Sequence, residues 1–295
     1  MTATAAELRY VEETRSKRWS RAVGTFVRQR PLGAIGAALI IVMLLTALLA
    51  DLIAPFDPTA FGPALEPPGG VHLLGTDSFG RDLLSRIIHG ARTALLVGFT
   101  SSLVGSTLGL VFGVTSAYFG GKIEQVIERL MDVLISFPLI VIAIAVVAAL
   151  GPGTGNVIVA ITFPVIPRVA RVVRSSALSI VAMPYIEAAR AVGSGALRIM
   201  FKHIAPNVFA PYLIMLTAFL GQAILLEASL SFLGLGVAEP VPAWGLMLRG
   251  AGMQFLERAP WLAIAPGVAI SLAVFGFNLF GDSLRDALDP RLRTA

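Results

Sequence analysis

The chain has 295 residues, of which 56% are hydrophobic and only 14% are charged. An average soluble domain carries roughly 25% charged residues, so this composition excludes a water-soluble protein and indicates a membrane protein. The net charge of +5 could suit nucleic-acid binding in a soluble protein, but its placement in this chain indicates orientation in a bilayer, so no nucleic-acid partner is expected.

The N-terminal residues 1–32 are polar and basic, and we expect a cytoplasmic tail. The part from Glu7 to Arg30 mixes apolar side chains with many arginines. It could form an amphipathic helix on anionic lipid or remain a solvated basic tail. The apolar run at 33–54 is longer than the core of a signal peptide and lacks a small-residue cleavage pattern, so we expect it to be retained as the first span.

Six stretches are apolar over nearly the length of about 20 residues that a helix needs to cross a bilayer. They lie near 33–54, 93–117, 135–150, 155–173, 208–232 and 262–281. The third and fourth are joined by Gly151-Pro152-Gly153-Thr154-Gly155, a run that predicts a tight turn and therefore a helical hairpin. The predicted fold class is an all-α membrane protein with six transmembrane helices.

The distribution of basic residues sets the predicted orientation, because they concentrate in short cytoplasmic segments. The segment from 168 to 203 contains six Arg or Lys residues and one acid, Glu187. Both the N- and the C-terminus are then predicted to be cytoplasmic. The cytoplasmic segments are the N-tail, 118–134, 174–207 and the C-terminal tail 282–295, and the opposite side receives 55–92, 151–155 and 233–261.

The stretch 183–193, Met-Pro-Tyr-Ile-Glu-Ala-Ala-Arg-Ala-Val-Gly, predicts a short helix outside the bilayer. Pro184 suits the first helical position. Glu187 falls in the first turn, where the helix dipole favours an acid, and Gly193 can end the helix in a left-handed cap. The small residues of this helix would let its backbone sit close inside a groove of another protein; they are Ala188, Ala189 and Ala191.

A second short helix fits Ala196 to His203, and Pro206 is expected to open the next span. Glu187-Ala188-Ala189, then Gly193, Ile204 and Pro206, resembles the EAA loop of binding-protein-dependent ABC importer permeases. In that family this loop is the coupling helix, which sits in a cleft of the ATPase subunit. The resemblance implies that the residues coupling the chain to the ATPase are Glu187, Ala188, Ala189, Arg190, Ala191 and Gly193.

Two of these coupling residues leave alternatives open. Glu187 and Arg190 could make polar contacts with the ATPase, or Glu187 could only cap its own helix.

Three further segments extend the resemblance over nearly the whole chain, to the dipeptide/oligopeptide/nickel branch and its DppC/OppC type of subunit. They are Leu74 to Arg86, Leu230 to Gly236 with Pro242-Ala243-Trp244-Gly245, and Gly281 to Pro290. The resemblance implies the type I ABC importer permease (MetI-like) fold. In domain terms, we expect a first helix at 33–54, an extracytoplasmic segment at 55–92 and a five-helix core at 93–281.

Polar residues in the expected extracytoplasmic segment allow two interpretations. Asp77, Arg81 and Asp82 could form a ligand or metal constellation, but a local turn and ion-pair network is favoured. The resemblance adds contact with a binding protein as a role for these three residues and for Trp244. The three histidines lack ligand spacing, and no metal site is predicted; they are His72, His89 and His203.

Glu227 lies inside an apolar span, where an acid is costly and marks a functional candidate by default. It could line the solute path or pair with a basic residue. It could instead sit near the outer end of its span and hold the Ser229–Gly236 segment, which we favour. After the last span, Arg285 and Asp289 could pair on one helical face or contact the ATPase together with Asp282 and Asp286.

Catalytic motifs are missing from the sequence. Gly120-Gly121-Lys122 lacks the spacing and the hydroxyl of a phosphate-binding loop. No cysteine is present to act as a nucleophile. We therefore expect no enzyme and no cofactor bound by this chain. The resemblance implies that ATP and Mg are used by two partner ATPase subunits, beside a second permease subunit of the DppB/OppB type and an extracytoplasmic solute-binding protein.

The combined prediction is a subunit in the prokaryotic cytoplasmic (inner) membrane, in contact with lipid, that forms half of a path for di- or oligopeptides. Nickel or another small solute is the alternative cargo. ATP binding would close the ATPases and reorient the spans through the coupling helices. A secondary transporter working alone would need coupling-ion sites and paired repeats, which the sequence does not show. A membrane scaffold would have no need for an ATPase lever.

Overall fold

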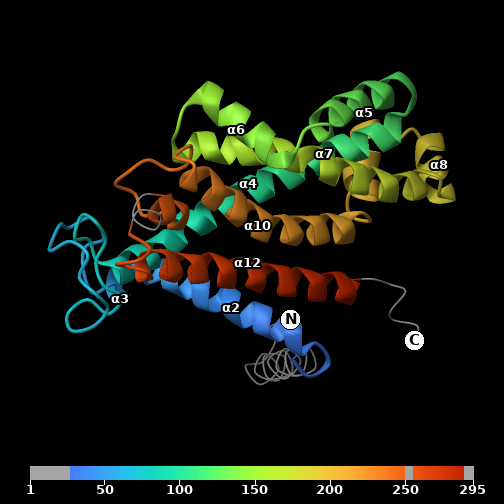
Figure 1. Cartoon of the computed structure of the whole chain (residues 1–295). Helices are drawn as coiled ribbons and strands as arrows, with labels where there is room; N and C mark the ends of the chain where they lie inside the picture. Colours follow the sequence, from blue (N-terminus) through green and yellow to red (C-terminus); the bar gives the residue numbers. More distant parts are fainter. Residues whose placement is uncertain (1–26, 250–254, 289–295) are drawn as a thin grey trace, which may run out of the picture.

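A computed structural model describes residues 27–249 and 255–288 of the chain (Figure 1). Within these ranges the protein is built from helices, which confirms the all-α prediction. The helices are α2 (Pro31–Leu48), α3 (Ala50–Ile53), α4 (Leu83–Phe119), α5 (Gly121–Ile135), α6 (Leu139–Leu150), α7 (Thr154–Val181), α8 (Pro184–Ala191), α9 (Ala196–Ile199), the π-helical turn η1 (Met200–Ile204), α10 (Phe209–Phe232), α11 (Trp244–Met247) and α12 (Trp261–Leu288).

Five of the described helices are long and apolar enough to cross a membrane: α2, α4, α7, α10 and α12. They lie lengthwise beside one another in Figure 1. The sixth candidate is a pair, α5 and α6, which meet at a bend of 91°. The prediction of a simple third span at 135–150 was therefore wrong in detail. With 12 residues, α6 is about 18 Å long, which is less than the roughly 30 Å of hydrocarbon in a bilayer.

The helix α5 occupies much of the segment expected to be a loop, 118–134. Its acidic side chains pair with arginines of α7. The charges that make this segment look like a polar loop therefore hold α5 against α7. Arg174 pairs with Glu124 and Glu128, and Arg171 pairs with Asp132. The opposite side of α5 carries exposed apolar side chains, namely Ile123, Val126, Leu130 and Val133.

Three glycines of α4, spaced four residues apart, bring α4 against α7. A Cβ on Gly105 would lie 2.9 Å from the Cβ of Val165, and one on Gly109 would lie 2.6 Å from the Cβ of Val169. A Cβ on Gly113 would lie 2.6 Å from the carbonyl oxygen of Ala170. Small residues of this kind let two membrane helices approach closely. The two backbones are therefore packed without room for an added methyl group.

The first and last spans, α2 and α12, pack through a pair of glycines. A Cβ on Gly36 of α2 would lie 2.7 Å from the carbonyl oxygen of Gly276 in α12. Arg30, just before α2, donates to the carbonyl of Ser283 at 2.8 Å and lies 3.8 Å from a carboxylate oxygen of Asp286. These contacts are possible because α12 continues to Leu288.

The helix α12 therefore continues beyond 281, the expected end of the last span. Asp282, Arg285 and Asp286 lie on the helix α12 rather than in a tail. The N-terminal residues 1–26 and the C-terminal residues 289–295, with Asp289 and its expected pair with Arg285, lie outside the described residues.

The connecting segments gather at two opposite ends of the helices (Figure 1). One end carries residues 54–82 and α11, and the other carries α8. The turn between α6 and α7 belongs to the first end, since the N–H of Gly153 donates to the carbonyl of Gly236 at 3.1 Å. Gly151 and Gly153 have φ values of 87° and 140°, which only glycine adopts readily, and the predicted α6–α7 hairpin is confirmed.

Replacement of Gly109 by Ala should destabilise the protein, because the new Cβ would overlap Val169 of α7. Overpacking of this kind costs about 1–3 kcal/mol. The control is Gly267→Ala in α12, where a Cβ meets nothing within 4 Å. Thermal unfolding of the detergent-purified protein should show a lower midpoint for Gly109→Ala and an equal or higher one for Gly267→Ala. Equal midpoints for the two variants would contradict the close α4–α7 contact.

Candidate functional site

The first candidate site is the short helix α8 at one end of the molecule. Pro184 occupies its first position, as the sequence predicts. Ile186 is completely buried and packs in the same cluster as Ile199 and Ile204. One side of α8 is therefore anchored to the core. The residues expected to couple to the ATPase lie mainly on the exposed side: Glu187, Ala188, Arg190, Ala191 and Gly193 are exposed, and Ala189 is half-buried.

Gly193 ends α8 in the predicted left-handed conformation, with φ of 76°. Its N–H donates to the carbonyl of Arg190 at 2.9 Å, and the N–H of Ser194 donates to the carbonyl of Ala189 at 3.0 Å. These two bonds form a Schellman motif, which satisfies carbonyls at the helix end. A Cβ on Gly193 would meet nothing within 4 Å, so glycine is needed here for its backbone conformation and not for space.

The segment after Gly193 differs from the prediction of one helix from Ala196 to His203. The structure has α9 followed by the π-helical turn η1, in which the N–H of Ala205 donates to the carbonyl of Met200 at 2.8 Å. The next long helix, α10, begins at Phe209 and not at Pro206.

The structure adds contacts around α8 that the sequence did not reveal. The guanidinium of Arg190 lies 4.9 Å from the centre of the Tyr118 ring at the end of α4, a cation–π contact. Three large apolar side chains near α8 are well exposed: Val192, Leu197 and Phe201. Large exposed apolar residues this close together in the chain mark a candidate surface for contact with another protein. These bulky residues, outside any predicted span, were the signal available in the sequence.

The second candidate site lies at the opposite end, around Asp77, Arg81 and Asp82. Asp77 accepts hydrogen bonds from the N–H groups of Phe79 and Arg81 at 2.8 and 3.0 Å, and from Nε of Arg81 at 2.7 Å. Nη1 of Arg81 donates to Glu239 at 2.8 Å. Burial opposes the charge of Arg81, but its bonds to Glu239 and Asp77 outweigh burial and raise its pKa. The arrangement is a turn stabilised by ion pairs.

Asp82 is the N-cap of α4. Its Oδ2 accepts from the N–H and the hydroxyl of Ser85, each at 2.7 Å, and its Oδ1 lies 2.8 Å from Nδ1 of His72. All of its oxygens are thus used within the chain. Among the described residues, no group of three or more His, Asp or Glu side chains is placed to hold a metal ion.

Two further residues named from the sequence are buried. Trp244 donates from Nε1 to the carbonyl of Ile87 at 3.0 Å and covers Gly90 of α4. Glu227 accepts a hydrogen bond from the hydroxyl of Ser231 at 2.7 Å, and that hydroxyl accepts from the N–H of Val237 at 3.3 Å. Glu227 is therefore linked through Ser231 to the segment after α10. This contact is the one expected if Glu227 holds that segment in place.

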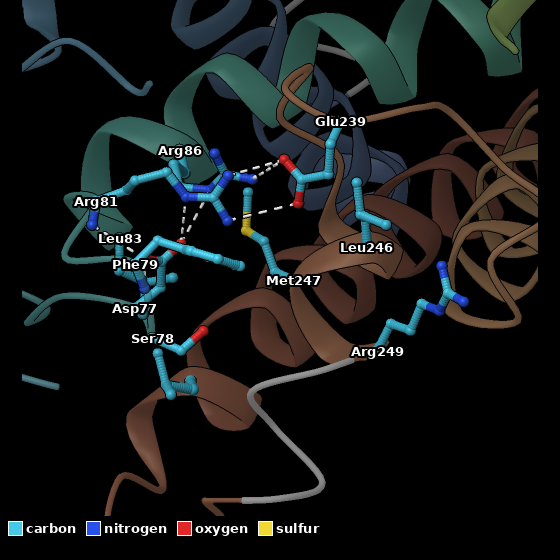
Figure 2. A pocket seen from close by; sticks show the side chains of 11 residues that line it. Asp77, Ser78, Phe79, Arg81, Leu83, Arg86, Glu239, Leu246, Met247 and Arg249 are labelled. Carbon is cyan, nitrogen blue, oxygen red and sulfur yellow. Dashed lines mark hydrogen bonds and ion pairs between the residues drawn. The ribbon is translucent and has the colours of Figure 1, made fainter. Parts of the chain in front are cut away.

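A pocket of about 410 Å³ opens beside the Asp77–Arg81 turn (Figure 2). Arg86 and Glu239, which the sequence did not single out, are part of its wall. Figure 2 shows the guanidinium of Arg86 between Asp77 and Glu239, 3.7 Å from a carboxylate oxygen of each. Arg81 and Glu239 are 158 residues apart in the chain, so this site joins the segment before α4 to the segment after α10.

Sequence comparisons match most of the chain. The family described as binding-protein-dependent transport system inner membrane component matches residues 105–294, and the N-terminal TM domain of oligopeptide transport permease C matches residues 17–68. The dipeptide transport system permease protein DppC of Alkalihalophilus pseudofirmus is 42% identical over 274 residues, covering 91% of this chain and 88% of that one.

A further relative and a solved structure also resemble this chain. The glutathione transport system permease protein GsiD of Pectobacterium atrosepticum is 41% identical over 280 residues, covering 94% of this chain and 92% of that one. Among solved structures, an inward-facing conformation of the MetNI methionine ABC transporter aligns with a TM-score of 0.56 at 21% identity, covering 69% of this chain and 96% of that one. The similarity to this solved structure shows the fold of the chain.

Replacement of Asp82 by Ala should lower stability, because it removes the N-cap of α4 and the partner of His72. Loss of an N-cap costs about 0.5–2 kcal/mol. Asp82→Asn keeps an oxygen acceptor for Ser85 and should unfold at an intermediate temperature. The measurement is the thermal midpoint of each purified variant. Unchanged stability of Asp82→Ala, combined with loss of binding-protein docking, would instead assign Asp82 to a partner surface.

Proposed function

Because this chain belongs to the family of binding-protein-dependent transport system inner membrane components, we propose that it forms half of the solute path of an ATP-driven peptide importer. The names of its relatives support this cargo, since they are transport system permease proteins named for dipeptides, for di- and tripeptides and for glutathione. The observation that carries the proposal is the exposed helix α8, anchored by Ile186 and ended by Gly193 between two candidate spans.

The proposed topology has six spans, with α5 and α6 counted as one, and both termini in the cytoplasm. The bundle supports it, because α8 and residues 54–82 lie at opposite ends (Figure 1). The α8 end carries Arg190, Arg198 and Lys202 of the 168–203 segment, which favour the cytoplasmic side. Residues 54–82 and the pocket beside Asp77 are then extracytoplasmic.

The proposed coupling uses α8 as a lever. An ATPase that moves the exposed side of α8 would act on Ile186, which is packed in the core formed with residues of α4, α7 and α10. Such cores are close-packed and transmit displacement. Arg190 offers a second connection, since it stacks on Tyr118 at the end of α4. A push on this loop would therefore reach three spans together.

The remaining partners follow from the same proposal. Two ATPase subunits bind the cytoplasmic loops and use ATP and Mg, so this chain acts as a permease and not as an enzyme. A second permease subunit of the DppB/OppB type completes the path, and a solute-binding protein delivers cargo from outside. The family description supports dependence on a binding protein.

Reconstitution tests the cargo and the partners. Proteoliposomes with this chain, the second permease subunit and both ATPases should accumulate a labelled dipeptide only when ATP and the binding protein are present. This chain alone should accumulate none, because it lacks a phosphate-binding loop. Accumulation of nickel in place of peptide would reject the cargo, and ion-gradient-driven uptake by this chain alone would reject the ATP-driven importer.

Replacement of Gly193 by Val should uncouple the transporter. A β-branched residue at φ of 76° costs about 1–3 kcal/mol of backbone strain, which favours loss of the Schellman motif that shapes α8. Because the site has open space, Gly193→Asn is a matched control that tolerates the left-handed conformation.

The readout for this pair is ATP-dependent peptide uptake by the reconstituted complex. Gly193→Val should lose most uptake while it still inserts and assembles, and Gly193→Asn should keep most of it. Equal uptake by the two variants would exclude a role for the helix end in coupling.

A further inference from the structure

The pocket beside the Asp77–Arg81 turn contains a buried arginine with an incomplete set of partners. The side chain of Arg86 is 1% exposed. Its Nη1 donates to the carbonyl of Pro58 at 3.0 Å, but its Nε has no hydrogen-bond partner among the described residues. A buried donor left without an acceptor costs about 1–3 kcal/mol. The wall of the pocket therefore holds a guanidinium whose hydrogen-bonding capacity is not fully used by the described residues.

The two acids beside Arg86 do not supply that acceptor. Their oxygens lie 3.7 Å from the nitrogens of Arg86, which is too far for a good hydrogen bond. They are instead bonded to Arg81, at 2.7 Å from Asp77 and 2.8 Å from Glu239. Arg249 also contributes to the lining, which therefore contains three arginines and two carboxylates. The local balance of charge favours an anionic ligand.

The rest of the wall fixes the size and character of such a ligand. The volume of about 410 Å³ lies near the lower end of the range of about 300–1,000 Å³ for small-molecule sites. Five apolar side chains line it, namely Phe79, Leu83, Leu246, Met247 and Leu262. A small molecule with an apolar body and one carboxylate fits this combination, because a guanidinium binds a carboxylate through paired, charge-assisted hydrogen bonds.

We propose that this pocket is a subsite for the terminal carboxylate of a small peptide, with Arg86 as its main partner. Arg249, an exposed residue whose guanidinium lies beside Gly234, provides a second cation at the edge of the pocket, apart from Arg86 (Figure 2). Glu239, whose side chain is 47% exposed, can accept a hydrogen bond from the ammonium group of the same peptide. The inference rests on the proposed peptide import, and it places a solute contact on the permease itself.

The test measures peptide binding to the complete transporter in nanodiscs, with the binding protein omitted. The probe is labelled dialanine, and the competitors are unlabelled dialanine and dialanine amide, which lacks the carboxylate. Dialanine should compete at least about tenfold better than the amide, because loss of one charge-assisted pair is worth about 1.4 kcal/mol or more.

Two variants connect this preference to the pocket. Arg249→Gln is an exposed change that leaves the fold intact, and Arg86→Lys keeps the charge but loses the planar guanidinium. Both variants should lower the affinity for dialanine toward that for the amide, and both should leave the affinity for the amide unchanged. The matched control is Arg92→Gln on the same helix, since Arg92 pairs with Asp51 and does not line the pocket.

The outcomes separate this inference from the proposed function. Equal binding of dialanine and its amide, or no saturable binding at all, would overturn the subsite. So would a loss of binding-protein affinity in Arg249→Gln with no change for dialanine, because the pocket would then take an acidic side chain of that protein. Carboxylate-selective binding without ATP-driven uptake would support the subsite and reject the importer, and uptake without selective binding would reject the subsite alone.

Discussion

The close packing of α4 against α7 is the contact on which both candidate sites depend. In a bilayer the hydrophobic effect does not hold helices together, so van der Waals contact at short range has to do so. Gly105, Gly109 and Gly113 provide it because they place no side chain of α4 between its backbone and the valines and carbonyls of α7. The pocket lies at the beginning of α4, and α8 follows the end of α7, so both sites are positioned by this helix pair.

The parts of the fold that the sequence predicted correctly depend on local signals. The long helices were predicted from the length of the apolar stretches. The two ends of α8 were predicted from Pro184 and Gly193, because their backbone preferences act within one helical turn. The bend between α5 and α6 falls at Pro138, a local signal for a helix end that the prediction did not use, whereas the position of α5 has a cause that is not local. The acids of α5 are explained only by arginines of α7, which stand about 40 to 50 residues away. Without that pairing, the same charges indicate a loop.

In the candidate sites, too, the features that depend on local sequence were predicted and those that depend on distant segments were not. The residues of α8 follow from their own stretch of sequence, but the contact of Arg190 with Tyr118 does not. Asp77, Arg81 and Asp82 were singled out as a local network, and their mutual contacts are local. Glu239 and Arg86 were missed because their partners come from segments far apart in the chain, and a single sequence carries no sign of that proximity.

The length of α4 connects the two ends of the molecule. Its 37 residues make a helix of about 55 Å, well beyond the roughly 30 Å of hydrocarbon, so it must extend past the bilayer. Asp82 caps it at the pocket, and Tyr118 meets Arg190 near its other end. The glycine contacts leave no space for α4 to turn about its axis against α7 without collision. A displacement of α8 that moves Tyr118 would therefore carry the wall of the pocket with it. The proposed coupling surface and the proposed solute subsite are thus joined by one long helix.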